Sequence, residues 1–325
     1  MLVPNAAFWR AVRKTRAPGL LAPILIAVPF FVVLAPQTQE TPQSPKISVA
    51  VRLVRVSATV RDKHGRIVPT LNRDDFALYE DGHVETVNNF MSQSDLALTL
   101  GLVVQTGLGP RRKPALHNAS AASYGFLDHM LRENKDSAFV IRFDQSVDLL
   151  QDSTSSRPKL QTALQMMQTA DSDSKGLLGS TLLYDAICLA STALTKAPEG
   201  RRAIFVLSDG IDRGSKKTLE DAIAEAQRAD VSVYSILVAE NWPGPNGKKV
   251  LERISTETGG RLFNIAHGQN VTQVYAQAEE ELRNEYLLGY TPTPADTGAG
   301  YHRIHLATVQ KGLTVQTRDG YYSER

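Results

Sequence analysis

Residues 203–210, AIFVLSDG, indicate the fold of the central part of this chain. Five apolar residues run without a break into Ser208-Asp209-Gly210. A short apolar run that ends in a turn is typical of a strand buried on both faces of a parallel sheet. Asp209 then lies just beyond the carboxyl end of that strand, where open α/β sheets bind their ligands. The Asp-Gly pair is also what a simple turn would contain, so both interpretations of Asp209 stand.

Strands and helices are predicted to alternate from residue 96 onward. Apolar and β-branched runs predict strands at 96–104, 138–143, 147–150, 203–207 and 231–238, with 261–265 as an edge strand. Apolar residues at helical spacing predict helices around 126–131, 160–167, 219–226 and 271–282. Such alternation predicts an α/β fold with a doubly wound, mostly parallel sheet.

The two flanks of this region have a β pattern. Four short strands are predicted within 47–90, and three more at 286–290, 302–308 and 313–317. Either set alone would leave sheet edges unpaired. We therefore expect the two sets to pair, so that the α/β domain is inserted in, or flanked by, a small β-sandwich. The expected division is 47–94 (first sandwich part), 95–288 (α/β domain) and 289–325 (second sandwich part).

The N-terminus carries an export pattern. Arg10, Arg13, Lys14 and Arg16 precede the uncharged apolar run 19–35. A basic segment followed by an apolar one is typical of a signal peptide, although the length of this run also fits an uncleaved membrane anchor. Residues 1–35 are thus either a signal peptide or an N-terminal anchor, and the Pro/Gln-rich residues 36–46 are a linker. Both interpretations predict an exported protein that is periplasmic, envelope-anchored or secreted, with membrane contact only through this segment.

Composition narrows the range of partners and activities. Without those four cations, 32 basic residues face 34 acidic ones, which argues against a nucleic-acid binder. Cys188 is the only cysteine and is predicted to be a small buried residue of a helix. Ser208 lacks the context of a nucleophile, and the seven histidines are scattered. His302 and His305 lie three apart on a predicted strand and should face opposite sides. These patterns do not favour an enzyme.

Three loops should meet at the carboxyl edge of the sheet, and their motifs resemble a known family. An apolar strand followed by QTGLG, then GSTLLYDAI, then FVLSDG is similar to the von Willebrand factor A domain, over about residues 95–290. The flanking motifs SATVRDKHGRIV, DDFALYEDG, YLLGYTP and RDGYY resemble the VWFA-related family of exported bacterial proteins, known largely from acidobacteria. The resemblance implies a domain that binds other proteins through these loops.

The resemblance also implies a metal-ion-dependent adhesion site. That family uses Asp-x-Ser-x-Ser from the first loop, Thr from the second and Asp from the third. Thr181 and Asp209 match the last two, but Gln105, Gly107 and Gly109 stand at the first three positions. An amide offers only a neutral oxygen and glycine offers no side chain, whereas Mg²⁺ prefers hard oxygen ligands. We expect weak binding of Mg²⁺ or Mn²⁺, or no cofactor at all. Thr181 would then cap the helix that begins near residue 182.

The first loop runs directly into Arg111-Arg112-Lys113 before a helix. Close backbone N–H groups, a helix N-terminus and cations suit an anion, so Arg111 and Arg112 are candidate contacts for an acidic partner group. A solvated basic turn is the alternative. The sequence as a whole predicts an exported, non-enzymatic adhesion-type protein whose partner binds the loop face. A structural scaffold subunit of a cell-envelope assembly, with no ligand at that face, is the competing interpretation.

Overall fold

The structure, a computed structural model, describes most of the chain after residue 52. The described residues are 53–92, 96–106, 123–170, 181–198, 200–238, 246–265, 271–292 and 299–323. The export segment and the linker predicted for residues 1–46 lie outside them. Within the described part, no helix combines the length and the apolar character needed to cross a bilayer.

The central sheet has six strands in the order β10-β9-β8-β5-β6-β7. Every neighbouring pair is parallel except β6 and β7, which are antiparallel. The predicted mostly parallel sheet is therefore confirmed, with β10 at one edge. The strands are β5 (Leu98–Gln105), β6 (Ser137–Phe143), β7 (Val147–Thr154), β8 (Arg201–Ser208), β9 (Ser232–Leu237) and β10 (Leu262–Asn264).

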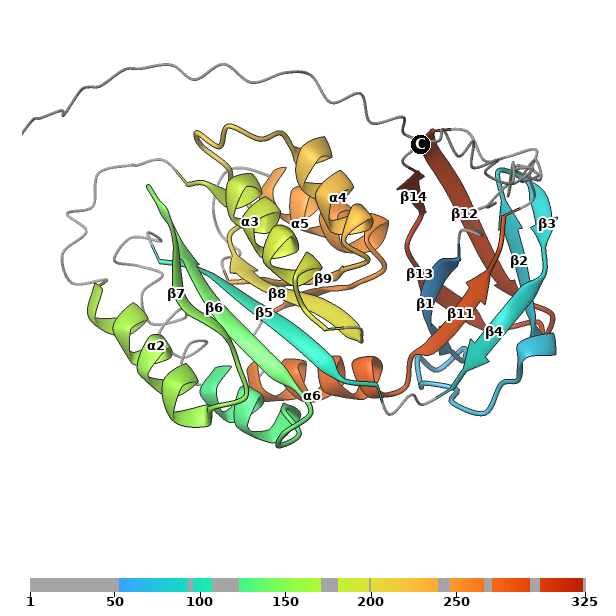
Figure 1. Cartoon of the computed structure of the whole chain (residues 1–325), viewed down its shortest axis with the longest axis horizontal. Helices are drawn as coiled ribbons and strands as arrows, with labels where there is room; N and C mark the ends of the chain where they lie inside the picture. Colours follow the sequence, from blue (N-terminus) through green and yellow to red (C-terminus); the bar gives the residue numbers. More distant parts are fainter. Residues whose placement is uncertain are drawn as a thin grey trace, which may run out of the picture. The chain divides into compact units, whose positions relative to one another are not determined.

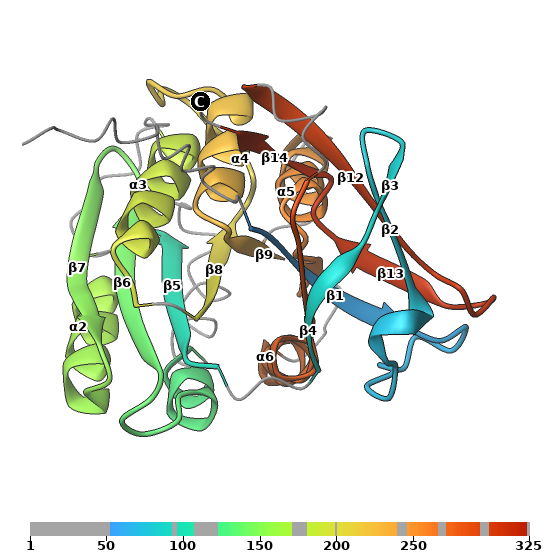
Figure 2. The ribbon, with the colours of Figure 1, turned by 45° about the vertical axis from the view of Figure 1, so that its right-hand side comes forward.

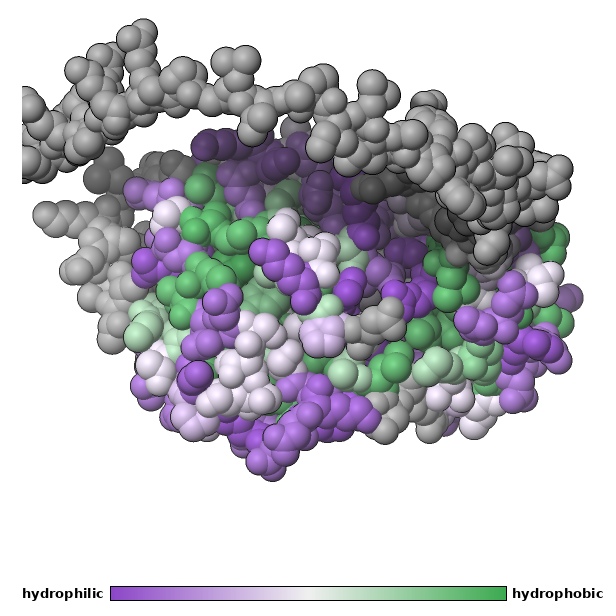
Figure 3. Space-filling view, in the orientation of Figure 1, coloured by the Kyte–Doolittle hydropathy of each residue, from purple (hydrophilic) through white to green (hydrophobic). Residues whose placement is uncertain are grey.

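Helices cover both faces of this sheet (Figures 1 and 2). On one side lie α3 (Leu183–Thr195), α4 (Leu219–Arg228) and α5 (Asn246–Glu257). On the other lie α2 (Arg157–Ala170), α6 (Val271–Arg283) and the helical residues 123–130. Helix α5 was not among the predicted helices. Hydrophobic residues gather over α3 on the face shown in Figure 3, and its Leu189 is 39% exposed.

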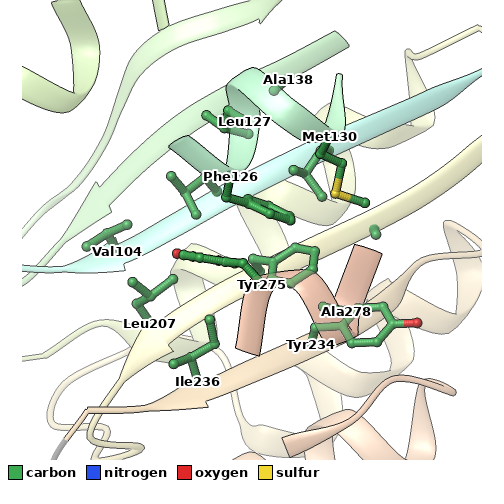
Figure 4. Packing of buried hydrophobic residues seen from close by; sticks show 14 of the residues in the cluster. Val104, Phe126, Leu127, Met130, Ala138, Leu207, Tyr234, Ile236, Tyr275 and Ala278 are labelled. Atoms are coloured by element: carbon green, nitrogen blue, oxygen red, sulfur yellow. The ribbon is translucent and has the colours of Figure 1, made fainter. Parts of the chain in front are cut away.

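Two apolar cores fill the spaces between the sheet and its helices, because strand residues alternate between the two faces. In one core the rings of Phe126 and Tyr275 stack with their centroids 4.2 Å apart (Figure 4). The ring of Phe205 in β8 lies beside this pair, with its centroid 4.9 Å from that of Phe126. To its other neighbour, Tyr234, the centroid distance is 5.2 Å. The second core joins Val103, Ile204 and Val206 to α3, α4 and α5. The central strand residues are buried on both sides, as residues 203–210 predicted.

The flanking strands form two antiparallel four-stranded sheets, in the orders β13-β1-β11-β4 and β14-β12-β2-β3. N-terminal strands pair with C-terminal ones in both: β1 with β11 and β13, and β2 with β12. Apolar residues of both sheets share one core, so the predicted sandwich is confirmed. The strands are β1 (Val54–Arg61), β2 (Phe76–Glu80), β3 (His83–Glu85), β4 (Val87–Met91), β11 (Tyr286–Tyr290), β12 (Gly300–Thr308), β13 (Thr314–Thr317) and β14 (Gly320–Ser323).

All of β11 pairs within the sandwich, against β1 and β4. The boundary expected between residues 288 and 289 therefore falls inside a strand. The α/β part ends with α6, and residues 284 and 285 lead into β11. The backbone hydrogen bonds of Tyr286, Leu287 and Leu288 are thus made to the sandwich.

Polar contacts join the sandwich to the α/β part. Arg61 of β1 forms an ion pair of 2.5 Å with Glu281 of α6, whose side chain is 1% exposed. Arg318 forms another of 3.0 Å with Asp230. Arg228 of α4 places its guanidinium 4.6 Å from the centre of the Tyr322 ring. Arginine is suited to such contacts because its planar fork pairs with carboxylates and stacks on aromatic rings.

Candidate functional site

The carboxyl ends of β5 and β8 lie side by side, because the two strands are parallel neighbours. Gln105 is the last residue of β5, and Ser208 is the last residue of β8. Both are almost fully buried, and Asp209, the next residue, is 9% exposed. Thr181, from the second loop, is 7% exposed. The edge of the sheet thus presents buried polar groups where the sequence predicted a site.

The side-chain oxygen of Gln105 connects the first loop to the third. Gln105 Oε1 accepts a hydrogen bond of 2.7 Å from Ser208 Oγ and one of 3.0 Å from the Asp209 backbone N–H. Ser208 Oγ in turn accepts from the Gly210 N–H at 2.9 Å, and Asp209 Oδ1 accepts from the Ile211 N–H at 3.1 Å. An amide oxygen has two lone pairs, and both hydrogen bonds of Gln105 are directed at the third loop.

Gly210 lies against the beginning of α5. Its φ is +75°, in the left-handed region, and a Cβ there would lie 2.2 Å from the carbonyl oxygen of Gly247. The same holds for Gly247, because a Cβ added there would lie 2.2 Å from the backbone oxygen of Asp209. Only glycine at both positions permits this approach of two backbones. The turn after β8 is therefore fixed by packing as well as by hydrogen bonds.

Thr181 joins the second loop to the third through its backbone. Its N–H donates to the Arg213 oxygen at 3.1 Å, and the Arg213 N–H donates to the Thr181 oxygen at 2.8 Å. The prediction that the Thr181 hydroxyl caps the following helix is wrong. The residue at the N-cap of α3 is Leu182, whose apolar side chain makes no capping hydrogen bond.

The caps of α3 come instead from the third loop. Asp212 Oδ1 accepts from the Tyr184 N–H at 3.2 Å, and Ser215 Oγ accepts from the Asp185 N–H at 3.2 Å. The Asp185 carboxylate returns the contact by accepting the N–H groups of Lys216 and Lys217. These bonds satisfy helix N–H groups that the helix itself cannot. Helix α3 and the third loop consequently hold each other in place.

The turn between β6 and β7 completes the edge. Asp144 Oδ2 accepts from Thr106 Oγ1 at 3.3 Å, and its backbone oxygen accepts from the Leu182 N–H at 3.0 Å. Asp144 Oδ1 also accepts the backbone N–H groups of Gln145 and Ser146 in its own turn. Its additional contact with Thr106 was not foreseen, because the sequence does not show that this turn meets the first loop.

A divalent cation does not fit the described residues of this edge. The carbonyl oxygen of Gln105 already accepts two hydrogen bonds, and a bound cation would have to displace these N–H and O–H donors. Thr181 and Asp209 alone would provide one hydroxyl and one carboxylate, so water would have to fill most positions around a six-coordinate magnesium ion. Gly107, Gly109, Arg111 and Arg112 lie outside the described residues.

Cys188, His302 and His305 lie away from this edge, and the structure shows the surroundings of each. Burial raises the pKa of the Cys188 thiol to about 12, so the predicted small buried residue is confirmed and is not a thiolate. His302 is buried and His305 is exposed, as the strand pattern predicted. Yet His302 is not isolated, because it lies beside Glu80 and Asp81 in the sandwich. No local sequence pattern indicates this contact, since strands far apart in the chain bring these residues together.

Comparison with known proteins identifies the α/β part. Residues 126–277 match the family model of the von Willebrand factor type A domain. No curated protein matches the sequence.

The solved structures that match this chain are distant from it in sequence. An aerotolerance-related membrane protein from Bacteroides fragilis is 16% identical, with 57% of this chain and 98% of that chain covered and a TM-score of 0.41. The vWF domain of the type V pili tip protein Mfa5 from Porphyromonas gingivalis is 9% identical, with coverages of 57% and 95% and a TM-score of 0.45. The PilB minor pilin from Streptococcus sanguinis, as its D319A mutant, is 12% identical, with coverages of 59% and 62% and a TM-score of 0.43. This chain thus spans less than two thirds of the pilin.

Proposed function

Because the chain contains a von Willebrand factor type A domain, we propose that it is an exported, non-enzymatic protein that binds another protein. Domains of this type are generally interaction modules. The proposed contact face is the carboxyl edge of the sheet, where Gln105, Thr181 and Asp209 lie. The sequence adds Gly107, Gly109, Arg111 and Arg112 as candidate contacts. Export rests on the basic and apolar pattern of residues 1–35.

We further propose that the adhesion site is degenerate and acts without a metal ion. The observation that carries this proposal is the position of the Gln105 side chain. Its oxygen holds Ser208 and the Asp209 backbone, so an amide links the first and third loops where a carboxylate and a cation would otherwise do so. The loop face is then organised before any partner binds. A preorganised surface loses less conformational entropy on binding.

The non-enzymatic assignment is supported by the state of the two nucleophile candidates. Ser208 donates its hydroxyl hydrogen to the amide of Gln105, which is not a base, and its side chain is fully buried. Cys188 is a protonated thiol inside α3. A nucleophile needs an adjacent general base or a lowered pKa, and neither residue has one in the described part of the chain.

Calorimetric titration of Mg²⁺ and Mn²⁺ into EDTA-treated protein tests the metal-free proposal. At millimolar metal we expect no heat and no change in melting temperature that depends on Asp209, because a ligand of the folded state must stabilise it. Binding that disappears in Asp209→Ala would refute the proposal, since Gln105 and water would then complete a metal site.

Site-specific photo-crosslinking in the native host tests the binding face. A photoreactive amino acid at Arg111 or at exposed Arg213 is expected to give a covalent adduct with a partner protein. The matched control is exposed Glu133, which follows the helix 123–130 and precedes β6 at the opposite edge of the sheet. Equal adducts from all three positions would contradict the proposal. Adducts only from exposed sandwich positions such as Val84 would favour the scaffold subunit instead.

The contribution of the basic turn is tested separately. If an acidic partner group binds there, Arg111→Ala with Arg112→Ala should lower adduct formation from Arg213 and reduce its sensitivity to salt. Unchanged adducts and an unchanged salt dependence would mean that Arg111 and Arg112 are only a solvated turn.

A further inference from the structure

A second cluster of polar residues lies inside the sandwich, on different strands from the loop face. Glu80 ends β2, and Asp81-Gly82 form the tight turn into β3, with φ values of +48° and +86°. The antiparallel pairing of β2 with β12 sets Glu80 opposite Ile304. His302, two residues earlier on β12, therefore lies next to this turn, although it follows Asp81 by 221 positions.

Three ligand atoms converge there. His302 Nδ1 lies 2.8 Å from Asp81 Oδ2 and 3.3 Å from Glu80 Oε1. The Glu80 side chain is fully buried, and that of His302 is 9% exposed. Atoms that coordinate one tetrahedral Zn²⁺ at about 2.0 Å lie about 3.3 Å from one another. The spacing of these atoms is thus close to that of a zinc ligand set, and one imidazole with two carboxylates is a combination that zinc accepts.

Each of the three groups is also oriented by a second partner. His302 Nε2 lies 3.1 Å from Ser323 Oγ, and Asp81 Oδ1 accepts from the Arg303 N–H at 2.8 Å. Glu80 accepts from Tyr321 at 3.1 Å and from the hydroxyl of Tyr290. Partners of this kind fix the ring of a metal-ligating histidine and the rotamers of ligating carboxylates. The orienting hydrogen bonds of a metal site are therefore in place.

Charge gives an independent reason for a cation. Two carboxylates lie within one partly buried cluster, and among the described residues no lysine or arginine forms an ion pair with Glu80. The Glu80 carboxylate is fully buried, and a buried charge is costly unless it is compensated. A divalent cation with neutral His302 brings the cluster to zero net charge.

From this geometry we propose that Glu80, Asp81 and His302 bind one Zn²⁺ ion. The fourth position faces Asp81, whose side chain is 37% exposed and lines an open groove of about 770 Å³ with Tyr79, Tyr301, Arg303 and His305. Asp81 is the one ligand of the three that lines this groove, because His302 and Glu80 are buried on the opposite face of their strands. The ion ties the β2–β3 turn to β12 and so joins the two ends of the chain. This site is separate from the loop face and does not depend on its function.

The test uses the full-length, tag-free chain, stripped with EDTA and titrated with Zn²⁺. We expect one zinc per chain by elemental analysis after dialysis, a calorimetric binding curve, and a melting temperature raised by about 5 °C or more at about 100 times Kd. Asp81→Asn and His302→Gln should lose the bound zinc and the shift. Asn tolerates the left-handed backbone at this turn, and Gln nearly conserves volume.

Two matched controls locate the ion. His305→Gln changes a histidine of the same strand that faces the other side, and Asp209→Asn changes the loop face; both should bind zinc as the unmodified chain does. If the two ligand variants do not fold, Ser323→Ala retains all three ligands and should weaken binding about 10- to 100-fold. The proposal is overturned if no zinc binds, if zinc binding persists in Asp81→Asn and His302→Gln, or if it is lost in Asp209→Asn. Where the two ligand variants do not fold, unchanged zinc binding in Ser323→Ala overturns it.

Discussion

The α/β part and the sandwich are stabilised in different ways. The α/β part uses one continuous stretch of chain, from β5 to α6, and places an apolar core on each face of its sheet. The sandwich has one smaller core and takes its strands from both ends of the chain. It also buries the polar groups of Glu80 and His302. Local sequence is thus sufficient to specify the first part, whereas the second requires residues more than 200 positions apart to meet.

The largest expected difference is between isolated fragments. Residues 96–285 alone should fold and unfold cooperatively, because their sheet and both cores are complete. Residues 47–95 alone should not fold, because β1 and β2 would lack β11, β12 and β13. Far-UV circular dichroism during heating measures both. A cooperative transition of 47–95, or none for 96–285, would show that the two parts do not differ in this way.

A cavity in the α/β core is expected to have the next largest effect. Phe205 is fully buried and packs against Phe126 and Tyr234, so Phe205→Ala should lower the free energy of unfolding by about 3–5 kcal/mol. Urea unfolding measures this change. Leu189→Ala on the exposed side of α3 is the control and should change stability by less than about 1 kcal/mol. A similar small loss for both would mean that the aromatic core is not tightly packed.

Glu285, at the junction of the two regions, should make stability depend on pH. Burial raises the pKa of its carboxyl to about 7, against the opposing effects of Arg201 and the Tyr234 hydroxyl. The folded state therefore holds this proton more tightly than the unfolded state, and stability falls as pH rises from about 4.5 to about 7. Glu285→Gln removes that fall and should stabilise the protein by up to about 3 kcal/mol at pH 8.

Asp136 provides an internal control for the pH measurement. Although burial raises the pKa of this carboxyl, hydrogen bonds from Arg132 and Arg283 hold it at about 2. Its stabilising contribution is present above about pH 4 and is lost as pH falls toward 2. The unmodified chain and Glu285→Gln should therefore lose stability alike in that lower range. If they differ there but not between pH 4.5 and 7, the assignment to Glu285 is wrong.

The smallest expected effect concerns the cap that the third loop supplies to α3. Asp212→Ala removes the acceptor for the Tyr184 N–H and should cost about 1 kcal/mol. Asp212→Asn keeps an oxygen at this position and should cost less. Chemical unfolding of the two variants in parallel measures the difference, and equal costs would mean that the carboxylate charge, not the cap, is what matters.

The sequence predicted elements that local pattern determines and missed those that depend on distant partners. The buried strand at 203–207 was clear because every residue in it is apolar. Helix α5 was missed although Leu251 and Ile254 have helical spacing and are buried, because its first turn, Asn-Gly-Lys-Lys, resembles a loop. Pairing of the two flanks followed from the general cost of unpaired edges.

At the candidate site, the sequence indicated which residues meet but not how they bond. Gln105 was correctly expected to offer only a neutral oxygen, but its hydrogen bonds to Ser208 and Asp209 depend on the exact spacing of two strands. The cap predicted at Thr181 was wrong for the same reason, since the side chain that caps α3, Asp212, comes from another loop. The Glu80–His302 contact depends on a strand register that no local pattern reveals.

The pairing of β1 with β11 and β13 has a consequence for how the protein is made. A ribosome delivers β1 first, and more than 200 residues must follow before its partner strands exist. The α/β part is complete in the meantime and can fold while β1 and β2 remain exposed. The sandwich closes only when the last strands have left the ribosome. A chain interrupted before residue 300 therefore carries a folded α/β part with unpaired β-strands, which is prone to aggregation or degradation.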